Sequence, residues 1–185
     1  MNIVLSWDLF IIVFFSVIIA YSFIVGRNQT IKIIIGTYMA TLAADGVANL
    51  AHKYLGGPTP IVKFLGGPSA DEILITMKII LFIIVVVTIA VRGGFEVSIL
   101  AEQRLPIRVL MTFLFGVLNA GLIVSTLLLY VSGLSLIGAA QIGTISTIGE
   151  NSMLVQLMIE NYSLWFSLPA ISLVVVSFVE GEPLD

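Results

Sequence analysis

Three polar side chains suited to exchanging protons or binding ions lie close together in one apolar stretch of the sequence. Asp45, Asn49 and His52 are spaced by four and three residues, so a helix places them on one face. A carboxylate inside a membrane is costly unless it is paired or neutralised, which makes Asp45 a functional candidate. Next to it, His52 would suit a proton relay, since both groups can titrate near neutral pH once desolvated.

Asp45 is open to three interpretations. In the first, it is an interfacial carboxylate that reaches water, with the other two polar side chains on the same face. In the second, it forms a structural ion pair with Lys53 or Lys78. In the third, it belongs to an ion or proton path. A helix rises by about 1.5 Å per residue, which puts Asp45 about 20 Å from Lys32 and predicts a place in the outer half of the membrane.

The rest of the composition argues against several kinds of functional site. The chain has no cysteine and one histidine, which excludes disulfides and thiolate ligands and argues against a zinc site. No paired carboxylates and no Ser-His-Asp set accompany the polar face, so we expect no enzyme activity, no metal and no cofactor. The net charge is −3 without a basic cluster, which makes nucleic acid an unexpected partner.

The composition also indicates whether the chain folds in water or in lipid. Of the 185 residues, 59% are apolar and 10% are charged, whereas soluble domains carry about 25% charge. A water-soluble fold of this size cannot bury the excess, because its surface would be largely hydrocarbon. The chain is therefore predicted to be an integral membrane protein with the lipid bilayer as its first partner.

The apolar residues fall into four segments long enough to cross a membrane, which takes roughly 20 residues. They run from residue 7 to 26, 31 to 51, 73 to 91 and 107 to 131. A fifth run, from 164 to 179, contains Pro169 and predicts a bent, re-entrant or fully crossing helix. The predicted fold is all-α, with a four-helix transmembrane domain at residues 1–132 and an external amphipathic segment at residues 133–185.

Basic residues orient these helices. Arg27 and Lys32 flank the first predicted loop, and Arg92, Arg104 and Arg108 flank the third. Loops rich in Arg and Lys stay in the cytoplasm. This rule predicts that both termini lie outside.

A repeat with a period of ten residues separates the second and third segments. Residues 53–59 and 63–69 each join a cation, an aromatic residue and a leucine to a Gly-Gly-Pro turn. Gly and Pro favour tight bends, and the cations and rings suit the headgroup region. Either the repeat is a duplicated loop, or it contacts lipid or a partner. The predicted contact residues are Lys53, Tyr54, Lys63, Phe64 and, in the C-terminal segment, Trp165.

Small residues recur every four positions in two of the apolar segments. Such stripes let helices approach closely, so these positions are predicted to pack against neighbouring helices. The residues are Gly36, Ala40, Ala44 and Ala48 in the second segment, and Gly116 and Ala120 in the fourth. Asn119, next to Ala120, is predicted to form a hydrogen bond across helices.

The C-terminal segment contains an amphipathic stretch. Met153, Leu154, Leu157 and Met158 lie on one helical stripe within residues 150–161. The opposite face is acidic rather than basic, so attraction to anionic lipid is not expected to hold it. We expect this helix to pack on the bundle or on a neighbouring subunit, with Trp165 anchoring the following run at the membrane surface.

Short motifs spread over most of the chain carry a family resemblance. They are Trp7-Asp8 and Gly26-Arg27 around the first segment, Arg108-Val109-Leu110, Phe115-Gly116-Val117-Leu118 and Leu122-Ile123-Val124 in the fourth, and Glu150-Asn151-Ser152-Met153-Leu154 after it. In these motifs the chain resembles the colicin V production (CvpA) family of small bacterial membrane proteins. It departs from the family pattern at Ile107, Met111 and Asn119-Ala120, where relatives carry Asp, Gly and Arg-Gly.

The resemblance implies a four-helix protein of the bacterial inner membrane, linked to peptide toxin export and to envelope integrity. The leading hypothesis is a component that self-associates, as a homo-oligomer, or binds other membrane proteins. The alternative hypothesis is a small ion or proton channel or transporter, with Asp45, Asn49 and His52 lining the path.

Overall fold

The structure is a computed structural model of the 185-residue chain. It describes residues 7–54, 70–93, 105–133 and 152–179, without the side chains of residues 52, 70–73, 105 and 179. The described residues form helices and no strand, which confirms the all-α class. The helices are α1 (Trp7–Val25), α2 (Arg27–Tyr54), α4 (Ala70–Arg92), α5 (Leu105–Val131), α6 (Met153–Glu160) and α7 (Tyr162–Val179).

Four of these helices are long and apolar enough to cross a membrane. The candidate spans are Trp7–Val25, Arg27–Ala51, Leu74–Arg92 and Pro106–Val131. They agree with the four predicted segments to within a few residues. The agreement follows from length and composition, because about 20 apolar residues make a helix that lipid can surround.

The predicted loop at Arg27 was wrong. α2 begins at Arg27, directly after Gly26, so the chain reverses at a single residue. Gly26 has a φ of 82°, a left-handed conformation that costs glycine little because it has no Cβ. The amide and the hydroxyl of Thr30 both donate to the Gly26 carbonyl, at 3.0 and 2.9 Å, and this bonding starts α2 without a loop.

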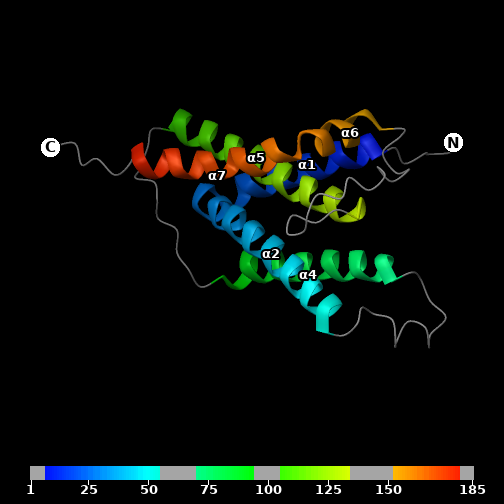
Figure 1. The fold of residues 1–185 in the computed structure, drawn as a ribbon. Coiled ribbons are helices and arrows are strands. Elements are labelled where there is room, and N and C mark those ends of the chain that lie inside the picture. Colours follow the sequence, from blue (N-terminus) through cyan, green and yellow to red (C-terminus); the bar gives the residue numbers. More distant parts are fainter. Residues whose placement is uncertain (1–6, 55–69, 94–104, 134–151, 180–185) are drawn as a thin grey trace.

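α5 is the central helix of the bundle. It contacts every other described helix, while α2 lies between α4 and α5 (Figure 1). Of the most apolar window of each helix, 72% is buried in α5 and 56% in α2, against 11% in α1 and 6% in α4. The interior is therefore built around α2 and α5, and the outer faces of α1 and α4 are left for lipid or other proteins.

The helices of the bundle run between two ends. We call the end where α1 begins and α2 finishes the Tyr54 end. The opposite end, where α1 passes into α2, is the Arg27 end.

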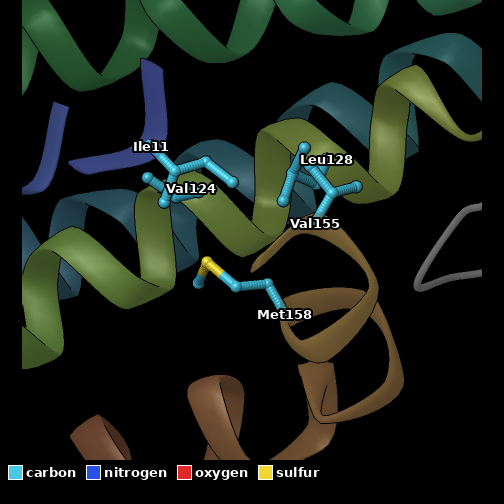
Figure 2. Packing of buried hydrophobic residues seen from close by; sticks show 5 residues of the cluster. All are labelled: Ile11, Val124, Leu128, Val155 and Met158. Carbon is cyan, nitrogen blue, oxygen red and sulfur yellow. The ribbon is translucent and has the colours of Figure 1, made fainter. Parts of the chain in front are cut away.

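α6 lies at the Tyr54 end, on α1 and α5. Its Val155 and Met158 pack against Ile11, Val124 and Leu128 (Figure 2). This fits the expectation that the amphipathic helix packs on the bundle.

The stripe predicted for α6 was only partly right. Met158 is buried, but Met153 is 77% exposed and Leu157 is 45% exposed. Val155, which the stripe left out, is buried instead. The side of α6 that faces the bundle is set by its contacts with α1 and α5, and hydrophobicity along an eight-residue helix does not determine it.

α6 and α7 together form a bent helix pair, which corresponds to a broken span or to a re-entrant loop. They meet at an angle of 60°, and as a pair they pass the same test of length and apolarity as the four long helices. α6 starts beside Asp8 at the Tyr54 end. Leu173 and Val176 of α7 pack against the buried cluster that contains Ile31 and Ile34, the residues of α2 toward the Arg27 end. The pair thus runs the length of the bundle (Figure 1). The division at residue 132 and the placement of both termini stay predictions.

Candidate functional site

The polar face of α2 is buried along most of its length. Thr37, Thr41 and Asp45 are 0%, 2% and 0% exposed. The two threonine hydroxyls donate to carbonyls one turn earlier, those of Ile33 and Thr37, at 2.9 and 2.8 Å. Both hydroxyls are thus satisfied within α2, whereas the carboxylate of Asp45 pairs with a lysine of another helix.

Asp45 forms an ion pair with Lys78 of α4. The Nζ of Lys78 lies 3.1 Å from Oδ1 of Asp45, and the two side chains are 12% and 0% exposed. This geometry is the ion pair of the second interpretation, with Lys78 as the partner. The interfacial carboxylate of the first interpretation does not fit it, because the helices around Asp45 keep its side chain from the surface.

The structure does not bring Asn49, the second residue of the predicted path, into this interior. Asn49 is exposed near the end of α2. The side chain of His52 lies outside the described residues. The third interpretation, an ion or proton path through all three residues, stays a prediction.

Tyr130 of α5 completes the site, and sequence reasoning missed it. The Nζ of Lys78 lies 5.6 Å from the centroid of the Tyr130 ring, within the range of a cation–π interaction. The Tyr130 hydroxyl donates to the Thr41 carbonyl at 3.1 Å, and Phe82 meets the ring edge-on. A tyrosine one residue before the end of the fourth apolar segment was the available signal, but nothing in the sequence aligned it with Lys78.

The positive charge of Lys78 compensates the negative charge of Asp45 within the site. An ion pair removed from water is tolerated when its members compensate each other, and loss of one member leaves a costly uncompensated charge. The site offers one carboxylate and one phenol to a cation, and the described residues hold no group of three or more His, Cys, Asp or Glu side chains arranged for a metal ion.

α4 is held to α2 by two further contacts at the Arg27 end. Gln29 Nε2 donates to the Ala90 carbonyl at 2.9 Å, and Lys32 Nζ donates to the Gly93 carbonyl. Gln29 falls within the first predicted loop and Lys32 lies at its flank, so the sequence does not indicate that either residue joins two helices.

The small residues of α2 line its contacts with α4 and α5. A Cβ atom built on Gly36 would lie 2.6 Å from Cγ2 of Ile89, so only glycine fits this approach. Ala40 and Ala44 belong to one buried cluster with Phe82 and Tyr130. Ala48 is also buried.

The small residues of α5 are buried as well. Ala120 is fully covered, and a Cβ atom on Gly116 would lie 3.2 Å from Cβ of Ser22 in α1. Asn119 is 1% exposed, but the structure gives its Oδ1 no hydrogen-bond partner among the described residues. The interhelical bond predicted for Asn119 is not found at this atom.

The predicted lipid or partner contacts divide into three groups. Lys53 and Tyr54 are exposed at the end of α2, with Nζ 5.3 Å from the ring centroid. Lys63 and Phe64 lie outside the described residues. Trp165 is half-buried inside the molecule, with its ring 5.9 Å from that of Phe15, so it anchors α7 to the bundle.

Asp8 has a structural role that the sequence did not reveal. Its Oδ1 accepts hydrogen bonds from Ser152 Oγ at 2.5 Å and from the Leu154 amide at 3.1 Å. Ser152 is itself the N-cap of α6, with its hydroxyl accepting from the Val155 amide at 3.2 Å. A carboxylate near the N-terminus of a helix satisfies its free amides and its dipole, so Asp8 of α1 fixes where α6 begins.

Comparison of the chain with protein-family models, with curated proteins and with solved structures finds no match in any of the three. The resemblance to the CvpA family therefore stays a prediction. Its two motifs around the first segment now have structural explanations in this chain, since Asp8 caps α6 and Gly26 makes the reversal between α1 and α2.

Proposed function

We propose that this chain is a multi-pass protein of the bacterial inner membrane that works by binding further copies of itself or other membrane proteins. The CvpA resemblance gives the setting, which is envelope maintenance or the export of toxin peptides. It is proposed to be a non-enzymatic component of that assembly.

The observation that supports this proposal is the unequal burial of the four long helices. Only 11% and 6% of the apolar windows of α1 and α4 are buried in the bundle. Two complete helices thus present their outer faces along the bundle. Membrane helices associate through such faces when packing or hydrogen bonds favour it.

Site-specific photo-crosslinking in native membranes tests the proposal. A crosslinking residue is placed at Ile80, Ile84 or Val87 of α4, which are 52%, 55% and 53% exposed. The control position is Phe82 of the same helix, which is 1% exposed. We expect a recurring dimer or partner band from the outer positions and none from Phe82. Monomer alone at every outer position, repeated on the outer face of α1, would contradict the proposal.

A second candidate function is proton or ion transport centred on Asp45. It is favoured by the Asp45–Lys78 pair, because charged residues inside membrane bundles often belong to ion or proton pathways. Flux is measured with the purified protein in liposomes, for the wild type and for Asp45→Asn. Loss of flux in a folded variant would support transport, and unchanged flux would remove Asp45 as its centre.

A further inference from the structure

The contact between α2 and α4 is held by different bonds at its two ends. At the Arg27 end, Gln29 and Lys32 donate to backbone carbonyls of α4, and these acceptors do not titrate. In the middle, Gly36 lets Ile89 approach closely. At the Tyr54 end, Lys78 forms its ion pair with Asp45. Of these contacts between described residues, the ion pair is the one whose acceptor can be protonated.

The surroundings of Asp45 set which charges count. α4 contributes Lys78, and α5 contributes Tyr130, whose hydroxyl is occupied by the Thr41 carbonyl. α1 contributes two apolar side chains, Phe14 and Ile18, to the buried cluster that contains Ala44 and Tyr130. The groups that α4 and α5 bring to the carboxylate thus include the Lys78 cation and the Tyr130 phenol.

The two members of the pair differ in their access to water. Asp45 is fully buried, whereas Lys78 keeps 12% of its side chain exposed. Lys78 lies eight residues after the start of α4, or about 12 Å along the helix. A lysine stem extends along apolar surface toward the interface, so Lys78 has a route to the Tyr54 end that Asp45 lacks.

We propose that the Asp45 carboxylate is a proton-binding site at which Lys78 is the resident counter-cation, and that proton uptake opens the α2–α4 contact at the Tyr54 end. One proton from water forms an O–H bond on the carboxyl group. Lys78 keeps its own proton and moves toward water. α4 then stays attached through Gln29, Lys32 and Gly36, so the helix pair opens from one end.

Infrared spectroscopy of the whole protein in liposomes tests the site. The band of a protonated carboxyl group is assigned to Asp45 by its loss in Asp45→Asn, and it is followed as the pH is lowered. We expect Lys78→Met to change the pH at which the band appears, because the ion pair with Lys78 favours the charged carboxylate over the protonated one. Lys78→Arg keeps the charge and should titrate near the wild type.

Lys53→Met is the matched control, since Lys53 is exposed and contacts its neighbour Tyr54. It should leave the Asp45 band unchanged. The proposal is overturned if no band depends on Asp45 over the whole pH range in which the wild type stays folded. It is equally overturned if Lys78→Met leaves the titration where it was.

Distances between spin labels test the opening, and they remain informative if Lys78→Met does not fold. The cysteine-free chain accepts label pairs at two places. Leu50 and Ile80, 55% and 52% exposed, report on the Tyr54 end, and the exposed Asn28 and Val91 report on the Arg27 end. We expect the first distance to lengthen at acid pH and in Asp45→Asn, with the second unchanged. Equal behaviour of both pairs would contradict the opening.

This inference does not depend on the proposed binding of other proteins, and it deepens the second candidate function by naming the ion and the group it displaces. An infrared titration of Asp45 without flux would support the proton site and reject transport. Flux that needs Asp45, without the effect of Lys78 on its titration, would do the reverse.

Discussion

α4 and the α6–α7 pair are attached to the α2–α5 interior in parallel ways. Each has a glycine at its closest approach: Gly36 against Ile89 for α4, and Gly121 against Trp165 for α7. Each also receives a side-chain donor on a backbone carbonyl. Gln29 donates to α4, and the Tyr38 hydroxyl donates to the Phe166 carbonyl of α7.

α4 and the α6–α7 pair each also contact one carboxylate, Asp45 of α2 for α4 and Asp8 of α1 for α6, and these two carboxylates differ in their surroundings. Asp45 is fully buried and has a charged partner, Lys78. Asp8 lies at the start of α1, is partly exposed, and accepts from the hydroxyl of Ser152 and the amide of Leu154. A buried charge needs a counter-charge to be tolerated, whereas neutral donors suffice where water reaches. The depth of each carboxylate thus explains its choice of partner.

The largest effect is expected from breaking the ion pair. Lys78→Met leaves Asp45 buried without its cation, and breaking a buried pair in this way costs about 3–5 kcal/mol. The free energy of unfolding in bicelles measures the loss. Lys53→Met, on the exposed end of α2, should cost little. Equal losses in the two variants would contradict the role given to the pair.

A second, smaller effect is expected at the glycine under α7. A Cβ atom on Gly121 would lie 1.9 Å from Cε3 of Trp165, so Gly121→Ala must push the ring or the helix away. Overpacking of this kind costs about 1–3 kcal/mol. Gly46→Ala is the control, because open space surrounds that position and alanine in a helix gains roughly 0.5–1 kcal/mol over glycine. Unfolding measurements should therefore give opposite signs for the two variants.

The cap that Asp8 provides should contribute less than either. Asp8→Ala removes the acceptor of the Leu154 amide and of the Ser152 hydroxyl, and loss of a helix cap costs about 1 kcal/mol. Hydrogen exchange of the Leu154 and Val155 amides measures it, with faster exchange expected. Asp8→Asn retains an acceptor oxygen and should change exchange less. Unchanged protection in Asp8→Ala would show that α6 starts without help from α1.

The last prediction concerns the side of the membrane on which α7 ends, and its test perturbs the protein least. Single reporter cysteines replace Ser177 near the end of α7, Lys53 near the end of α2 and Asn28 near its start, all exposed positions. If α6 and α7 cross the membrane together, Ser177 is labelled from the same side as Asn28 and from the side opposite Lys53. The C-terminus then lies across the membrane from the N-terminus. Labelling of Ser177 from the Lys53 side would instead make the pair re-entrant.

Local hydrophobicity and chain length settled much of the fold. The all-α class and the four long helices follow from runs of about 20 apolar residues, whatever those residues contact. The packing of the small residues of α2 and α5 against neighbouring helices could also be predicted, because these residues recur every four positions along one helix face. The reversal at Gly26 was missed because Arg27, Asn28 and Gln29 are polar, and polarity alone does not distinguish a loop from the first turn of a helix.

The partners of the polar residues were decided only by the tertiary structure. The sequence offered Lys53 and Lys78 to Asp45, and the packing of α4 on α2 selected Lys78. Tyr130 bonds to Thr41 across 89 residues, and Asp8 bonds to Ser152 across 144. Such pairings depend on how helices are aligned and rotated against one another. Hydrophobicity specifies which residues enter the membrane, while side-chain packing specifies which of them meet.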